Sequence, residues 1–324
     1  MAEASDETQK SGSGMLKKLL WAGVAVGTVA MINAAIFQKT PPLMYRQTGG
    51  QAKWLPLPDG DIAYEVAGEG KPLLLLHAIG AGCSAFEWRH VFGPLSETRQ
   101  VFAPDLLGFG KSDKPKITYT AETYLDLIAD FIEQAIGQKT DIIASSLSAA
   151  FAVALAQRRP ELVDKLILVC PTGLEALSAP LQPSGKAIAT ALSLPVLGAS
   201  LYNLLTSRMG LRQYLKMRVY ASPEPVDDAL VTHFHHAAHQ PGGDRVLPYF
   251  LGGYLNCNIA DALASLPEAP KLLWGAAASE TPLAQSEAFL DVRPDAQLVV
   301  LNNVGGLPHD ESPEAFLEIV EGWV

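Results

Sequence analysis

Beyond residue 41 the chain alternates short apolar runs with longer segments whose apolar positions recur at helical spacing. The short runs are rich in Val, Ile and Leu and are mostly uninterrupted by polar residues, as in strands that are covered on both faces of a parallel sheet. They lie at residues 62–66, 73–76, 101–103, 141–143, 166–169, 272–274 and 298–301. The pattern predicts an α/β fold with a mostly parallel central sheet and crossover helices.

The longer segments carry signals for the start and end of helices. Apolar residues recur at helical spacing over residues 124–136, where Thr120 offers a start cap and Gly137 a stop. The segment from about residue 174 to 253 breaks the alternation, because it has helical patches and Pro/Gly punctuation but no clear strand. An insertion of this size over the carboxyl ends of strands predicts a helical cap, and such caps enclose ligand pockets.

Residues 19–37 are almost wholly apolar and follow Lys17 and Lys18. As a helix they would reach about 28 Å, close to the thickness of the hydrocarbon layer of a bilayer. We therefore expect a transmembrane anchor helix within residues 15–40, preceded by a disordered polar tail at 1–14. A cleaved signal peptide and a buried globular helix are the alternatives. Basic residues flank the run on both sides, so the side of the membrane is not determined.

Composition limits the partners and cofactors. A chain of 324 residues with 48% hydrophobic content can form one large domain, at residues 50–324, and its net charge of -10 argues against a nucleic-acid partner. Cys83, Cys170 and Cys257 are too far apart for a disulfide framework or a metal cluster. His235 and His239 could share a helical face and bind a metal, but no carboxylate lies at a matching spacing. We expect no metal and no cofactor.

The candidate chemistry centres on Ser146, which falls between a predicted strand and a predicted helix. Ala144 and Ser148, two positions on either side, are both small. A strained strand-to-helix turn needs small residues there, because it brings neighbouring backbone close. The sequence therefore predicts that the turn forms and presents the hydroxyl of Ser146.

Four segments, in this order, resemble the α/β-hydrolase family of capped serine hydrolases, over nearly all of residues 50–324. They are His-Ala-Ile-Gly at 77–80, like the oxyanion loop; Pro-Asp-Leu-Leu-Gly-Phe-Gly-Lys-Ser at 104–112, like the Asp-x-x-Gly-x-Gly-x-Ser turn; Ala-Ser-Ser-Leu-Ser at 144–148, like the nucleophile elbow; and Gly-Gly-Leu-Pro-His-Asp-Glu at 305–311, like the Gly-His-x-Pro-His-x-Glu segment. The resemblance implies that Ser146 is the nucleophile and that the backbone N–H groups of Ile79 and Leu147 form the oxyanion hole.

The chain departs from the family at the two residues that would activate this serine. The resemblance places the acid at Ala278 and the histidine at Gly306. A serine hydroxyl needs a histidine within hydrogen-bond reach to take its proton. Of the seven histidines only His309 remains a candidate, although its position is one where family members keep a second, structural histidine. Two glutamates could replace the acid: Glu280, two residues beyond Ala278, and Glu175, after the preceding strand.

Three hypotheses follow. The first is a membrane-anchored α/β-hydrolase-fold protein with a degenerate triad, which binds an apolar ligand or assembles with membrane proteins. The second is an esterase or lipase-like hydrolase that acts on an apolar ester near the membrane and uses Ser146 with His309 and either Glu280 or Glu175. The third is a histidine-dependent metalloprotein, which ranks below the others.

Overall fold

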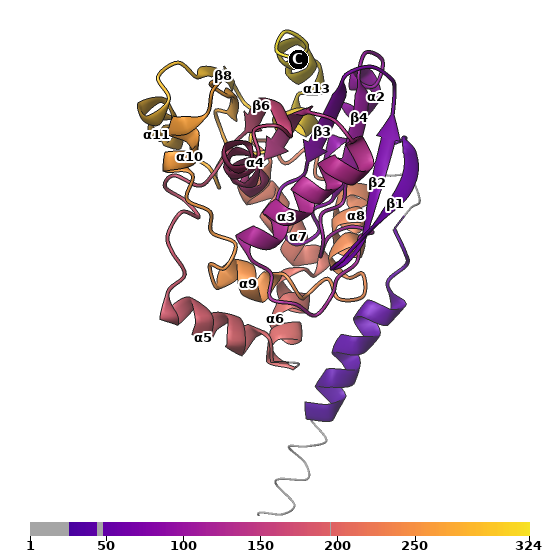
Figure 1. Ribbon diagram of the computed structural model, residues 1–324. Helices are drawn as coiled ribbons and strands as arrows, with labels where there is room; N and C mark the ends of the chain where they lie inside the picture. The colour runs from indigo at the N-terminus through magenta and orange to yellow at the C-terminus, as the bar shows by residue number, and fades with distance from the viewer. Residues whose placement is uncertain (1–25, 44–47, 195) are drawn as a thin grey trace, which may run out of the picture.

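The protein forms one eight-stranded sheet. The computed structural model describes residues 26–43, 48–194 and 196–324 (Figure 1). The strands are β1 (Gln51–Leu57), β2 (Gly60–Ala67), β3 (Pro72–Leu76), β4 (Gln100–Pro104), β5 (Thr140–Ser145), β6 (Val163–Val169), β7 (Lys271–Gly275) and β8 (Gln297–Leu301), in the spatial order β1-β2-β4-β3-β5-β6-β7-β8. β2 pairs antiparallel with both β1 and β4, and every other neighbouring pair is parallel. The predicted mostly parallel sheet is confirmed.

All seven predicted strands are present, and β1 is the strand that the apolar pattern missed. β3 and β5 are buried along their whole length, which explains their continuous apolar sequence. β1 lies at the edge of the sheet, is mostly exposed, and includes Lys53 and Pro56. An edge strand tolerates Pro and polar residues, because one of its sides needs no hydrogen-bond partner within the sheet.

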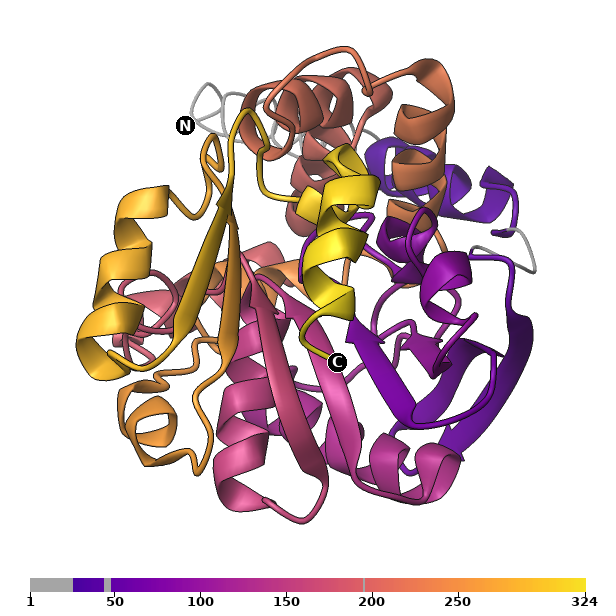
Figure 2. The ribbon, with the colours of Figure 1, turned by 90° about the horizontal axis from the view of Figure 1, so that it is seen from above.

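Helices cover both faces of the sheet (Figure 2). One face packs against α3 (Ala121–Phe131), α4 (Leu147–Arg158), α10 (Ala260–Ser265) and α11 (Ser286–Val292). The other packs against the short helix η1 (Ala85–Trp88), α2 (Phe92–Leu95) and α13 (Pro313–Glu321). The remaining short elements are η2 (Ile132–Ile136), η4 (Leu283–Gln285) and α12 (Pro308–Glu311). Two apolar cores, one on each face, fix the carboxyl ends of the parallel strands in place.

The predicted helix boundaries agree with the structure. Thr120 caps α3 through a bond from the N–H of Thr123, whose side chain accepts in return from the N–H of Thr120. The helical segment continues through η2 to Gly137, which has the left-handed φ of 75° that favours glycine at a helix end. α4 begins directly after Ser146 and ends at Arg158, ahead of Pro160.

Between β6 and β7 the described residues form helices and no strand. These helices are α5 (Pro183–Leu192), α6 (Leu197–Leu205), α7 (Arg208–Tyr214), η3 (Leu215–Val219), α8 (Asp228–Ala238) and α9 (Leu247–Leu251), followed by α10. Leu211, Leu215, Val231 and Phe234 from this set form a third apolar core with Leu307. Figure 1 shows α5, α6 and α9 together at one end of the molecule, remote from α13.

A helix at residues 26–39 precedes the sheet and lies at the same end as α6 (Figure 1). The predicted tail at 1–14 and the first part of the predicted anchor at 15–40 fall outside the described residues. Within the described ranges no single helix is both long and apolar enough to cross a bilayer. Only α5 and α6 taken together reach that length and composition, and they are bent by 88°.

Candidate active site

Ser146 lies on a strained turn between β5 and α4. Its φ of 54° and ψ of -121° are unusual for a residue with a side chain. The N–H of Ser146 donates to the carbonyl of Val169 at 2.9 Å, and Ala144 and Ser148 are completely buried. Small side chains on either side therefore let the turn form against β6, while the Ser146 side chain remains half-buried.

The loop after β3 is held against this turn. The hydroxyl of Ser148 donates to the carbonyl of His77, and His77 Nε2 accepts from the N–H of Leu106 at 2.9 Å. The N–H groups of Ile79 and Leu147 donate to no hydrogen bond within the described part of the chain. Both are therefore available as donors to a ligand at the turn. The role of Ser148 in placing the loop was not predicted, since its small size alone had explained it.

His309 forms no hydrogen bond with Ser146 in the described part of the chain. Its side chain is fully buried, and its ring stacks on Trp88 with the centroids 4.0 Å apart. His309 Nε2 is 3.4 Å from a carboxylate oxygen of Glu87, and that carboxylate accepts from the N–H of Ala78 at 3.1 and 3.2 Å. No hydrogen bond in the described residues joins the Ser146 hydroxyl to an imidazole. His309 thus connects α12 with η1 and the loop after β3.

The two residues that follow His309 also fasten loops together. Asp310 forms an ion pair with Arg89 at 2.7 Å and accepts a hydrogen bond from the hydroxyl of Tyr220. Glu311 accepts from the N–H groups of Gly305 at 2.9 Å and Ala221 at 2.8 Å, and its burial raises the pKa of its carboxyl. The segment around α12 therefore connects the end of η3, through Tyr220 and Ala221, with Arg89 directly after η1.

Gly306 and Ala278 lie on adjoining loops. The loop after β7 is bonded to β8 and the loop that follows it, through Ala276 N–H to Leu301 O and Ala277 N–H to Val304 O, both at 2.9 Å. Ala278 is 5% exposed. A Cβ atom added at Gly306 would meet only the carbonyl of Val219, at 3.5 Å, an ordinary van der Waals distance. The backbone at residue 306 therefore leaves room for a side chain to begin.

The two candidate acids face other partners. Glu280 is exposed, and it accepts from the hydroxyl of Tyr214 in α7 at 2.8 Å. Glu175 is exposed on the loop after β6, where its backbone carbonyl accepts from Ser178. Neither glutamate forms a hydrogen bond or ion pair with His309 among the described contacts; the carboxylate beside His309 is that of Glu87.

A sequence profile of the alpha/beta hydrolase family matches residues 73–319. The chain belongs to the alpha/beta hydrolase family. Among sequence relatives, it is 26% identical to an uncharacterized protein of Mycobacterium tuberculosis over 306 residues, which cover 87% of this chain and 80% of that protein. It is 28% identical to a 2-hydroxymuconate semialdehyde hydrolase of Pseudomonas putida over 278 residues, covering 79% of this chain and 88% of the hydrolase.

Solved structures of alpha/beta hydrolases share the fold. A meta-cleavage product hydrolase from Pseudomonas fluorescens IP01 superposes with a TM-score of 0.71 at 23% identity, over 86% of this chain and 97% of the hydrolase. A membrane phospholipase A superposes with a TM-score of 0.69 at 22% identity, over 96% and 97% of the two chains. At these identities the likeness shows the fold alone.

Three histidines in and directly after α8 of this alpha/beta hydrolase have partners within the protein. His233 stacks on Phe86 with centroids 3.6 Å apart, and burial lowers its pKa to about 3. His239 Nε2 is 3.2 Å from the Thr206 hydroxyl, and burial lowers its pKa to about 4. His235 Nδ1 lies 3.0 Å from the Thr206 carbonyl. The part of the chain that the structure describes contains no group of three metal-ligating side chains.

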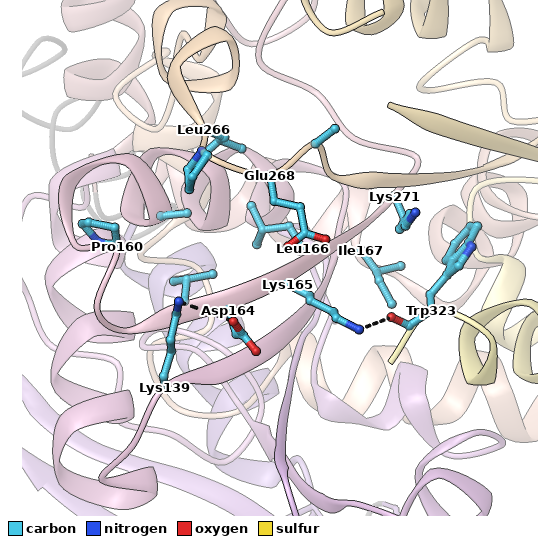
Figure 3. Close-up of a pocket in the computed structure, with 14 residues that line it drawn as sticks. Lys139, Pro160, Asp164, Lys165, Leu166, Ile167, Leu266, Glu268, Lys271 and Trp323 are labelled. Atoms are coloured by element: carbon cyan, nitrogen blue, oxygen red, sulfur yellow. Dashed lines mark hydrogen bonds and ion pairs between the residues drawn. The ribbon is translucent and has the colours of Figure 1, made fainter. Parts of the chain in front are cut away.

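A pocket of about 360 Å³ lies away from Ser146, where β6 and β7 begin (Figure 3). Lys139 and Asp164 pair across it at 3.4 Å, and Lys165 donates to the carbonyl of Trp323 at 3.0 Å. Ser146 follows the carboxyl end of β5, so it lies at the opposite end of the parallel strands from this pocket. The groups in the pocket tie the C-terminal residues to the sheet, and its lining contains no serine, cysteine or histidine.

Proposed function

We propose that this alpha/beta hydrolase is a membrane-anchored member of the family that binds an apolar ligand beneath its helices α5–α9 and does not hydrolyse it efficiently. The observation that carries the proposal is the position of His309, which is fully buried between Trp88 and Glu87 and forms no hydrogen bond with Ser146 among the described residues. The residues at positions 306 and 278, Gly and Ala, carry no group that could act as a base or an acid, which supports the proposal. A second function of the same catalytically inactive fold would be assembly with membrane proteins.

The frame around Ser146 supports ligand binding. The strained turn is retained, and the N–H groups of Ile79 and Leu147 remain available to a carbonyl oxygen. Removing the histidine from a serine triad lowers turnover by about a million-fold, whereas an oxyanion hole and binding alone retain about a thousand-fold acceleration over water. We therefore expect binding of an acyl or ester group at Ser146 with very slow hydrolysis.

The alternative function is a slow serine esterase that uses Ser146 with His309 and Glu280 or Glu175. The strained conformation of Ser146, kept although it is unfavourable, favours this alternative. In this case His309 would have to leave Trp88 and reach the serine hydroxyl. The two functions therefore differ in whether activity depends on His309.

The test restores the missing side chains with the double variant Gly306→His/Ala278→Asp. The parent chain should hydrolyse p-nitrophenyl esters no faster than Ser146→Ala and should resist labelling by a fluorophosphonate. General acid–base catalysis contributes about 10² to 10⁴-fold, so the double variant should exceed the parent by about a hundredfold or more. Adding Ser146→Ala to the double variant should remove the gain.

His309→Gln, with the thermal midpoint measured to establish folding, separates the two functions. Labelling of Ser146 in the parent that disappears in folded His309→Gln would support the esterase and contradict our proposal. No gain in the double variant would mean that the space beneath the helices no longer accepts an ester.

A further inference from the structure

Exposed large apolar side chains are concentrated on the helix at 26–39 and on the segment from α5 to η3. Of those in the described part of the chain, all but Trp54 and Leu251 lie there. The most exposed are Met209 at 75%, Met217 at 70%, and Met31 and Leu204 at 68%; Leu197 is 56% exposed. Scattered exposed apolar residues are normal on soluble proteins, but a gathered set marks a binding surface.

Contacts with α6 make these exposed residues part of one surface. Asn33 is 7% exposed; its amide donates to Ser200 at 2.9 Å, and its carbonyl oxygen accepts from Asn203 at 3.0 Å. Phe37 stacks with Tyr202, with centroids 6.1 Å apart. The polar side of the helix thus packs on α6, while Met31 remains exposed beside it.

Two grooves flank the helix at 26–39 and join it to its neighbours. One, of about 600 Å³, is lined by Ala34, Phe37 and Leu194. The other, of about 450 Å³, is lined by Ile32, Ile36, Lys39 and Arg208, together with His235 and His236. Apolar side chains of this helix therefore lie beside two cations, Lys39 of the same helix and Arg208 of α7.

The charges of these segments contrast with those of the whole chain. Residues 8–58 and 176–223 contain eleven Lys and Arg residues and none of the 34 Asp and Glu residues, although the net charge of the protein is -10. Arg212 and Arg218 pair with Asp228 and Glu280, whereas Lys39 and Arg208 pair with no carboxylate among the described residues. Exposed apolar residues bordered by unpaired cations match the interface of an anionic bilayer.

We propose that the helix at 26–39, α5, α6 and the start of α7 form a single docking face that rests on a bilayer containing anionic phospholipid. The helices over the sheet would then contact lipid themselves, with Leu197, Leu204 and Met209 at the acyl boundary and Lys39 and Arg208 among the head groups. This inference rests on the membrane association in the proposed function, and it is independent of the state of the catalytic residues.

The experiment measures contact between α6 and lipid in the full chain. Leu204→Cys is labelled with a fluorescent maleimide, and the protein is added to vesicles of phosphatidylcholine brominated on its acyl chains, with or without phosphatidylglycerol. Maleimides react with thiolates, and burial raises the pKa of Cys257 to about 11 and of Cys170 to about 12. The same burial raises the pKa of Cys83, and the labelled parent chain gives the background.

We expect the bromine to quench the label at Leu204→Cys on vesicles with phosphatidylglycerol, and not a label at Lys139→Cys near the start of β5. A basic residue near an anionic surface favours binding about fivefold, so Lys39→Gln/Arg208→Gln should lower the ratio of docked to undocked protein by about 25-fold. Lys139→Gln/Lys271→Gln, which removes two charges at the opposite end of the strands, should leave the ratio unchanged.

Other outcomes separate this inference from the proposed function. Sedimentation with vesicles without quenching at Leu204→Cys would overturn the docking face and leave an N-terminal anchor standing. Absence of any vesicle association would overturn both. Equal quenching with and without phosphatidylglycerol, or a dimer that shields the label from lipid, would also contradict an anionic bilayer as the occupant.

Discussion

Ser146 adopts a backbone conformation that costs about 1–3 kcal/mol for a residue with a side chain. The bond from its N–H to Val169 and the small, buried Ala144 and Ser148 hold it in place. The elbow conformation predicted from those small residues is present. Its partners could not be predicted in the same way, because the position of an imidazole depends on packing between segments that are far apart in the sequence.

His309 illustrates that limit. Its place in the segment 305–311 marked it as structural or as a relocated base, and the sequence left both alternatives open. The structure stacks it on Trp88 beside Glu87, some 220 residues earlier in the chain. Glu87 itself offered only one signal, a charge within the otherwise apolar helix at Ala85–Trp88. The fold of this family predicts the order of the loops, but not which side chains pair between them.

The neighbouring glycines 305 and 306 provide a matched test of backbone packing. A Cβ atom at Gly305 would lie 2.4 Å from the carbonyl of Val219 and 2.7 Å from the N–H of Ala221, so neighbouring backbone must shift. We expect Gly305→Ala to lower the free energy of unfolding by about 1–3 kcal/mol. Gly306→Ala meets nothing nearer than 3.5 Å and should change it by about 0.5 kcal/mol or less.

Chemical denaturation of the two alanine variants gives the comparison directly. Equal destabilisation would mean that residue 306 has no room for a side chain. In that case the double variant with histidine at 306 would also fail, for a reason unrelated to catalysis.

At the scale of elements, the sequence identified the strands better than the helices around them. Seven of the strands are continuous or nearly continuous apolar runs, and the eighth, β1, escaped notice because it is an exposed edge. The segment at 174–253 was expected to be helical, and α5 to α9 lie within it. The position of those helices over the sheet follows from side-chain packing, as in the core of Leu211, Val231 and Leu307, which periodicity does not reveal.

The helix at 26–39 buries one polar side chain, Asn33, within a run that is otherwise almost wholly apolar. If this helix spanned a membrane, Asn33→Leu should stabilise it, because the change removes an amide from the hydrocarbon layer. If the helix is docked on α6, Asn33→Leu should destabilise it. The hydrogen bonds to Ser200 and Asn203 disappear, and the amide of Asn203 is left without a partner. Losing a buried bond in this way costs about 1–3 kcal/mol, so amide exchange over residues 30–39 should accelerate roughly tenfold.

Hydrogen exchange of the detergent-solubilised protein measures this effect. Met31→Leu, two residues away and 68% exposed, serves as the control and should leave the exchange rates unchanged. Slower exchange in Asn33→Leu would mean that the contacts with α6 do not hold the helix.

At the scale of the whole molecule, the charges divide into two parts. Residues 8–58 and 176–223 contain none of the acidic residues. The rest of the chain contains all 34 of them and only thirteen of the 24 basic residues. A net charge of -10 would lead one to expect repulsion from an anionic bilayer. The proposed docking face can bind such a bilayer only if the attraction between its cations and the lipid exceeds the repulsion between the lipid and the acidic residues of the rest of the protein.

Ionic strength decides between these two influences. The screening length is about 30 Å at 0.01 M salt and about 8 Å at 0.15 M, whereas a domain of this size has a radius of gyration of about 19 Å. At 0.01 M the bilayer therefore interacts with the acidic residues of the whole protein as well as with the cationic face, and at 0.15 M mainly with the face.

We expect quenching of the label at Leu204→Cys by brominated anionic vesicles to be weaker at 0.01 M than at 0.15 M, and to fall again near 1 M, where the attraction of the face is screened too. Lys39→Gln/Arg208→Gln should flatten this maximum, and Lys139→Gln/Lys271→Gln should preserve it. A steady decrease of quenching from the lowest salt upward would mean that the acidic body does not oppose docking, and a steady increase would mean that apolar contact alone holds the face to the membrane.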